Sequence, residues 1–113
     1  MPPITVVETT VFKNKADGLL SDDDRLEIIT YLASNPKCGR IIQGTGGVRK
    51  TRIARNNDGK SGGYRTIHYY HNDEIPLFAL MIYSKNTKDS LSQNEKNELK
   101  KLVQELISNY YSR

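Results

Sequence analysis

The sequence predicts a small α+β domain, with an antiparallel sheet, helices before it in the chain and one helix at the C-terminus. Three observations lead to this fold class. A long apolar stripe at helical spacing lies near the C-terminus, two strand-like segments are rich in basic and aromatic residues, and the segment "LFALMIYS" at 77–84 is nearly all apolar. A length of 113 residues with 36% hydrophobic content is enough for one core. We therefore expect residues 1–113 to form a single domain.

The N-terminal third is expected to hold one short strand and two helices. The strand is "ITVV" at residues 4–7, and scattered apolar positions within 10–20 are compatible with a short helix. A clearer helix begins after Ser21, a good N-cap, because the three aspartates that follow complement the helix dipole. It ends at Asn35-Pro36, since the residue before a proline is disfavoured in a helix. Its apolar residues recur at helical spacing: Leu26, Ile29, Leu32 and Ala33.

The middle of the chain is expected to form three antiparallel strands. Residues 48–55 alternate as a strand, which places Lys50 and Arg52 on one face and Arg49 and Arg55 on the other. The aromatic and β-branched segment 64–70 predicts the next strand, and 77–84 predicts a central strand buried on both faces. The segments between them are rich in residues that favour turns.

The last helix is the most strongly marked element. Ser92 and Glu95 have the spacing of a capping box, in which each side chain bonds the backbone of the other. The apolar residues that follow share one helical face, which we expect to pack on the sheet: Leu99, Leu102, Val103, Leu106, Ile107 and Tyr110.

The segment "ARNNDGKS", residues 54–61, fits a relaxed version of the phosphate-loop pattern of nucleotide-binding proteins. Such a loop must lead directly into a helix, whose first amides bind the phosphates. Here two glycines and the strand-like segment "YRTIHYY" follow instead, and the similar "GTGGVRKT" at 44–51 also leads into a strand. We therefore interpret residues 54–61 as a hairpin connection and exclude a nucleoside triphosphate site.

The positive charge of the chain is concentrated in one segment. The net charge is +4, and residues 49–65 contain six basic residues and a single acid, Asp58. The other 11 basic and 12 acidic residues sum to −1. Such a concentration is typical of proteins that bind polyanions, although a solvated strand face remains the plain alternative.

Several other classes of function are not supported. The chain has no run of about 18 apolar residues, so we expect no membrane partner, and its N-terminus does not resemble a secretory signal. A single cysteine, Cys38, cannot form an internal disulfide, and a reducing cytoplasm is the simplest setting. His68 and His71 are three apart on a predicted strand and would point to opposite faces, so we expect no metal and no cofactor.

The basic strands have a chemical interpretation of their own. Lys50 and Arg52 share a strand face, Arg65 begins the next strand and Lys85 follows the one after. Antiparallel neighbours lie about 4.8 Å apart, so these side chains could meet in one concave patch that binds phosphate. Tyrosines beside them, Tyr64 among them, could stack on RNA bases. The residues alone leave RNA binding and RNA cleavage both open.

Four segments together resemble the HigB branch of the RelE/ParE toxin superfamily: "IIQGTGGVRKTRIA", "GKSGGYRTIHYY", "LFALMIYSKN" and "LSQNEKNELKKL". The resemblance covers roughly residues 4–107. It implies a microbial-ribonuclease-like fold and a ribosome-dependent mRNA endonuclease that acts in the ribosomal A site. It also implies an antitoxin partner, commonly a helix-turn-helix protein, through which alone operator DNA would be contacted.

Carried over position by position, the resemblance assigns expected roles to individual residues. Arg65 would hold the scissile phosphate, Lys50 or Arg52 would activate the ribose 2′-hydroxyl, and Lys85 would stabilise charge on the phosphate or on the leaving oxygen. Further RNA contacts are expected from the remaining basic and aromatic candidates: Arg49, Arg55, Lys60, Tyr64 and Lys88.

One departure from the family pattern concerns the general base. RelE itself carries an arginine directly after the lysine that matches Lys85, and a tyrosine before its last helix. Here those places hold Asn86 and about Leu91. The base is therefore open, with Tyr64 and Tyr83 as substitutes. Two other functions also remain: a ParE-like inhibitor of DNA gyrase with the same fold, and a non-catalytic RNA-binding module.

Overall fold

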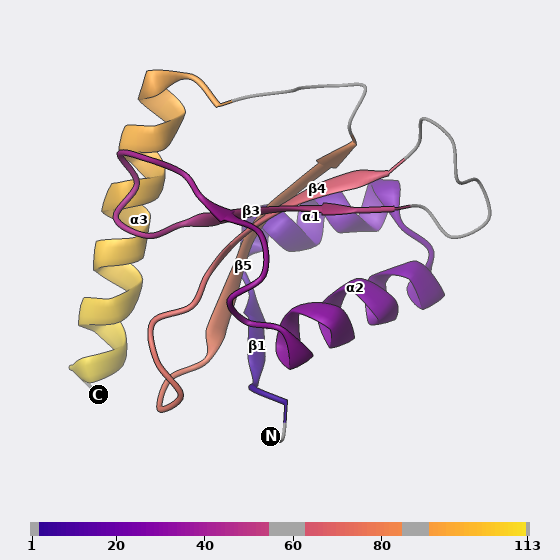
Figure 1. Ribbon diagram of the computed structural model, residues 1–113, viewed down its shortest axis with the longest axis horizontal. Coiled ribbons are helices and arrows are strands. Elements are labelled where there is room, and N and C mark those ends of the chain that lie inside the picture. The colour runs from indigo at the N-terminus through magenta and orange to yellow at the C-terminus, as the bar shows by residue number, and fades with distance from the viewer. Residues whose placement is uncertain (1–2, 55–62, 85–90, 113) are drawn as a thin grey trace.

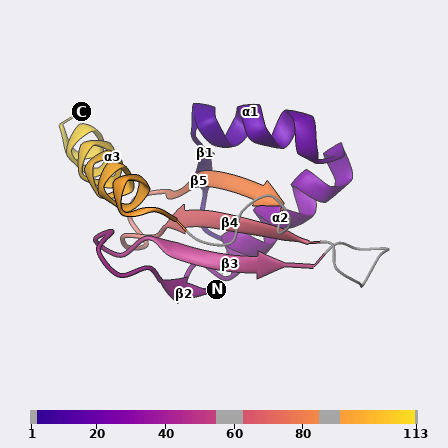
Figure 2. The ribbon, with the colours of Figure 1, turned by 90° about the horizontal axis from the view of Figure 1, so that it is seen from above.

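Five strands form one sheet in the order β1-β5-β4-β3-β2 (Figures 1 and 2). The computed structural model describes residues 3–54, 63–84 and 91–112. The longest strand, β5, lies between β1 and β4, which confirms the prediction of a central strand at 77–84. The bounds of the strands are β1 Val6–Glu8, β2 Arg40–Ile41, β3 Arg49–Ile53, β4 Tyr64–Tyr69 and β5 Leu77–Ser84.

Strand direction follows the prediction with one exception. Strands β3, β4 and β5 run side by side with alternating direction, and β2 pairs antiparallel with β3 (Figure 2). Strand β1, however, pairs parallel with β5, because α1 and α2 carry the chain back across the molecule before the sheet continues. The fold is thus α+β with a mostly antiparallel sheet.

Each helix begins at a side chain that accepts a backbone hydrogen bond. The helices are α1 (Thr10–Leu19), α2 (Asp22–Ser34) and α3 (Gln93–Tyr111). Before α2, the Ser21 hydroxyl accepts from Asp24 N at 3.1 Å, as its place before three aspartates predicts. The capping box of α3 is also confirmed: Ser92 Oγ accepts from Glu95 N at 3.1 Å, and Glu95 Oε1 accepts from Ser92 N at 2.8 Å. These bonds satisfy amides that have no partner inside the helix.

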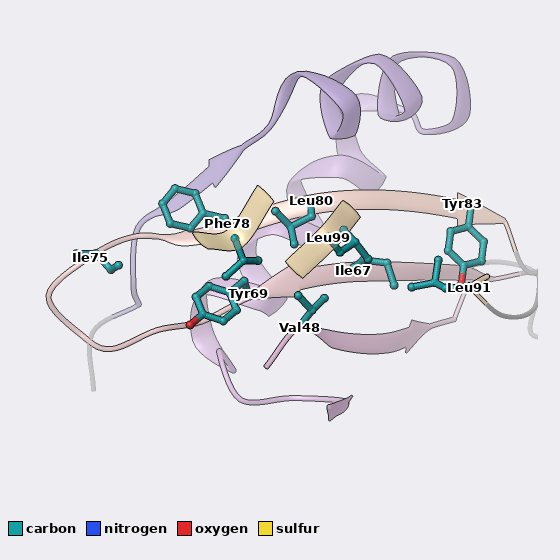
Figure 3. Packing of buried hydrophobic residues seen from close by; sticks show 10 residues of the cluster. Val48, Ile67, Tyr69, Ile75, Phe78, Leu80, Tyr83, Leu91 and Leu99 are labelled. Atoms are coloured by element: carbon teal, nitrogen blue, oxygen red, sulfur yellow. The ribbon is translucent and has the colours of Figure 1, made fainter. Parts of the chain in front are cut away.

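The helices cover both faces of the sheet, with α3 on one side and α1 and α2 on the other (Figure 1). Each face therefore has its own core. The α3-side core, shown in Figure 3, contains Val48, Ile67, Tyr69, Ile75, Phe78, Leu80, Tyr83, Leu91, Leu99 and Val103. The opposite core contains Phe12, Ala16, Ile28, Leu32, Tyr64, Leu77, Ala79 and Ile82.

A bulge in β5 decides which of its residues face α3. The register passes from Ile67 opposite Met81 to His68 opposite Ala79, so Leu80 is an extra residue on β5. An extra residue shifts the alternation of side chains along a strand. As a result Phe78 and Tyr83, five positions apart, both lie in the α3-side core.

Two local predictions were wrong. Leu26 was expected on the buried face of α2, but its side chain is 66% exposed, and the buried residues of the helix are Ile28 and Leu32. Leu26 is about 200° around the helix from Ile28, so the two cannot share a face. The predicted first strand at 4–7 is instead β1 at Val6–Glu8, and β2 was not predicted.

The proposed hairpin between the basic strands fits the sheet. Strands β3 and β4 are antiparallel neighbours, with Ile53 opposite Tyr64 at the end of the pairing. The connection that resembles a phosphate loop falls in 55–62, which lies outside the described residues, as does 85–90.

Candidate functional site

Three of the basic candidates lie on the same face of adjacent strands. Arg52 on β3 is directly opposite Arg65 on β4, and Lys50 is opposite Ile67. Residues paired across antiparallel strands share a face. Since Ile67 and Tyr83, the partner of Arg65 on β5, belong to the α3-side core, the basic residues lie on the α3 side of the sheet. The alternation in the sequence predicted the common face of Lys50 and Arg52, and the register of β4 adds Arg65 to it.

A hollow of about 490 Å³ is bordered by these side chains, and it is referred to below as the basic hollow. Its lining consists of Gly39, Arg40, Lys50, Arg52 and Arg65. Arg40 and Arg52 are exposed, whereas Lys50 and Arg65 are partly buried. Among the described residues, every side chain that lines the basic hollow is thus a cation, and none of these side chains is fully buried.

The arrangement of the cations indicates an anionic ligand. Like charges directly opposite each other on neighbouring strands destabilise a sheet by roughly 0.2–1 kcal/mol. Two pairs of cations are directly opposite each other in the sheet: Arg52 and Arg65, and Arg40 and Lys50. A phosphate placed between them would turn this repulsion into attraction, and a guanidinium can bind two phosphate oxygens at once.

Arg40 is a site residue that the sequence interpretation missed. It lies in β2, a strand of two residues that is too short to show an alternating pattern. Its register places it opposite Lys50 and at the wall of the basic hollow. The only signal in the sequence is a basic residue beside Gly39, shortly before the strand that carries Lys50 and Arg52.

Two candidates lie on the other face of the sheet. Arg49 points toward α2, and its Nη1 donates to the carbonyl of Lys37 at 2.9 Å. Tyr64 is 5% exposed and packs in the core beneath α1 and α2, where no RNA base could stack on its ring. Tyr64 is therefore not included in the interface proposed below. Tyr83, the other substitute for the general base, shares the face of Arg65.

Four candidates cannot be placed, because they lie outside residues 3–54, 63–84 and 91–112. They are Arg55 and Lys60 in the connection after β3, and Lys85 and Lys88 in the segment after β5. Their expected positions follow only from their neighbours, since Ala54 and Ser84 are the last described residues before each segment.

Beneath the basic hollow, on the opposite side of the sheet, lies a buried polar layer. Thr51 and Thr66 are opposite each other on β3 and β4, and His68 follows on β4; all three are buried. His68 Nε2 lies 2.9 Å from the carbonyl of Pro36, which can only accept, so the nitrogen donates. Burial lowers the pKa of His68, and the charge of Arg49 lowers it further, so the imidazole is neutral at pH 7.

A second hollow, of about 650 Å³, lies between α2 and the ends of β3 and β4. Most of its lining is apolar, including Leu26, Ile28, Tyr31, Ile53 and Tyr64. It lies on the face opposite the basic hollow, and the described residues that line it include no cation.

Fold and surface together define a small basic α+β protein with a group of cations around a hollow on one face of its sheet. A family model described as "RelE toxin of RelE / RelB toxin-antitoxin system" matches residues 9–111 of the chain. The chain therefore belongs to the RelE toxin family and is the toxin of a toxin–antitoxin pair, with an antitoxin as its protein partner. Toxins of this family are generally endoribonucleases. No helix within the described residues is long and apolar enough to cross a membrane.

Proposed function

We propose that the protein is an endoribonuclease that cuts mRNA in the ribosomal A site and uses the basic hollow to bind the scissile phosphate. The observation that carries this proposal is the direct opposition of Arg52 and Arg65, with Lys50 and Arg40 beside them. Family membership supports the nuclease activity, and the resemblance to the HigB branch supports the dependence on the ribosome.

The proposed reaction is an attack by the ribose 2′-oxygen on the adjacent phosphorus. The 2′-O–P bond forms while the bond from phosphorus to the 5′-oxygen breaks, which leaves a 2′,3′-cyclic phosphate and a free 5′-hydroxyl. The 2′-hydroxyl proton passes to a base, and the 5′-oxygen takes up a proton. Negative charge grows on the phosphate oxygens, where cations fixed in place stabilise the transition state.

Roles within the basic hollow follow from its geometry and from the family pattern. Arg65 and Arg52 hold the nonbridging phosphate oxygens from two neighbouring strands. Lys50, on the same face, is the candidate for proton transfer with the 2′-hydroxyl, and Lys85 remains the candidate for the leaving oxygen. Arg49 lies on the opposite face and would act on RNA only indirectly, through the segment that it contacts.

A cell-free translation reaction on a defined mRNA tests this proposal. Primer extension should reveal cuts in translated codons, and omission of ribosomes should abolish them. Chemical analysis of the upstream fragment should find a cyclic phosphate at its 3′ end. Intact mRNA in an inhibited translation reaction would overturn the proposal, and inhibition of DNA gyrase in a parallel supercoiling assay would then favour the ParE-like function.

A further inference from the structure

The segment Pro36–Gly39, between α2 and β2, is held from β3 and β4 at each of its residues. His68 Nε2 donates to Pro36 O at 2.9 Å, and Arg49 Nη1 donates to Lys37 O at 2.9 Å. Cys38 Sγ lies 3.3 Å from Thr51 Oγ1. These side chains come from the face of the sheet opposite the basic hollow.

Gly39, the last residue of the segment, packs directly against the backbone of β3. A Cβ at this position would lie 2.3 Å from Lys50 O, and the residue has φ of +80°, which favours glycine. The backbone of the segment thus lies directly against β3, closer than any residue with a side chain allows.

The attachment matters because Arg40 is the next residue. Strand β2 is only two residues long, so its own ladder of hydrogen bonds with β3 is short. Three features hold Arg40 at the wall of the basic hollow: its pairing with Lys50, the bond from Ile42 N to Val48 O at 2.8 Å, and the segment that precedes it.

We propose that Arg40 binds RNA phosphate in the basic hollow, and that His68 is a positioning residue that acts through the Pro36–Gly39 segment to hold Arg40 there. This inference rests on the proposed function, because it takes an RNA backbone as the ligand. The inference assigns Arg40 a role beside Lys50, Arg52 and Arg65, and it assigns His68, which is buried and does not contact RNA, a role in positioning.

The environment of His68 supports a role in positioning. Its side chain is fully buried, and Nδ1 is also buried with no hydrogen-bond partner among the described residues. An unpaired buried polar atom costs stability, so an apolar side chain would suit the core better. The imidazole offsets this cost through the hydrogen bond from Nε2 to Pro36 O.

A binding assay with four variants tests the inference. The probe is a fluorescent single-stranded RNA in which every ribose lacks a reactive 2′-hydroxyl, so binding is measured apart from cleavage. Arg40→Ala should weaken binding roughly five- to tenfold, the loss of one charge-assisted contact. His68→Leu should weaken it to a similar extent, whereas His68→Gln, which keeps a donor, should bind like wild type.

The combination of the variants separates positioning from a general structural effect. If His68 acts through Arg40, the double variant Arg40→Ala/His68→Leu should bind no more weakly than Arg40→Ala alone. Losses that multiply in the double variant, or an Arg40→Ala variant that binds like wild type, would overturn the inference. If His68→Leu does not fold, Thr51→Val removes the contact with Cys38 and must show the same lack of additivity.

The outcome is independent of the nuclease proposal. A wild-type protein that binds the RNA and shows this pattern, but leaves mRNA intact during translation, contradicts the nuclease function and upholds the role of Arg40 and His68. A wild-type protein that cuts mRNA, while Arg40→Ala binds normally, contradicts only the inference. Absence of RNA binding by the wild type overturns the inference, whereas the nuclease proposal is still decided by the translation reaction, because it places cleavage on the ribosome.

Discussion

Arg52 and Arg65 are directly opposite each other on two antiparallel strands, and the proposed function depends most on this pair. The alternation of side chains in the sequence is enough to place Lys50 and Arg52 on one face. The same alternation, applied to Tyr64, puts it on the face opposite Arg65, because the two residues are adjacent in β4. The prediction that Tyr64 stacks on RNA overlooked this consequence, and the ring is buried in the core.

Gly39 offers a test of how closely the segment before β2 packs on the sheet. Gly39→Ala should destabilise the protein by more than about 1–3 kcal/mol, because the new methyl group meets the backbone of Lys50 in addition to the strained φ. Gly44→Ala is the matched control, since Gly44 has φ of +84° and open space around it. Urea unfolding of both variants measures the difference, and equal losses would contradict the close contact.

The buried His68 predicts a dependence of stability on pH. Its pKa is lowered in the folded protein, so below the ordinary value near 6.5 the unfolded chain takes up a proton that the folded chain resists. The contribution of the neutral imidazole is thus complete above about pH 6.5 and is lost as the pH falls toward the folded pKa.

Thermal unfolding at pH 7.5 and pH 5 checks this sign. Wild type should lose more stability on acidification than His68→Gln, which has no proton to take up. If His68→Gln loses as much stability as wild type, the histidine is not the origin of the effect.

At the scale of the elements, the sequence was informative wherever a pattern was long enough to repeat. The stripe from Leu99 to Tyr110 places α3, and the Ser92–Glu95 spacing marks its start. Strand β2 has two residues and no period, and β1 pairs with a strand some 70 positions away. The bulge at Leu80 could not be inferred either, because β5 is apolar on both faces and has no alternation to interrupt.

The capping box at the start of α3 can be tested by a single substitution. Ser92→Ala should lower the free energy of unfolding by about 1 kcal/mol, because the amide of Glu95 loses its acceptor. Denaturant unfolding measures this change. Ser108→Ala, on an exposed position in the same helix, is the control and should change stability by less than about 0.5 kcal/mol. Equal effects of the two changes would mean that the cap does not stabilise α3.

At the scale of the whole molecule, apolar and basic side chains occupy different parts of the α3 side of the sheet. On the α3 side, the apolar residues of β4 and β5 pack against the helix, while Lys50, Arg52 and Arg65 border an open hollow. Three of the six basic residues of 49–65 thus share, with Arg40, one surface that a polyanion can contact.

Binding of single-stranded RNA should depend strongly on salt. We expect each of the four cations of the basic hollow to contact one phosphate. A plot of the logarithm of the binding constant against the logarithm of the salt concentration should then have a slope of about −3. Arg52→Ala should reduce the slope by about 0.7. Fluorescence anisotropy at several salt concentrations measures both values, and a slope near zero would mean that the hollow does not bind phosphates.

The central claim, that mRNA is cut at the basic hollow, is tested most directly by primer extension on mRNA during translation with Arg65→Ala. This variant should cut at least about a hundredfold more slowly than wild type, because a fixed cation at the developing charge is removed. Lys13→Ala, which removes an exposed positive charge from α1, should cut like wild type. Arg65→Ala that folds normally and cuts mRNA at the wild-type rate would contradict the account.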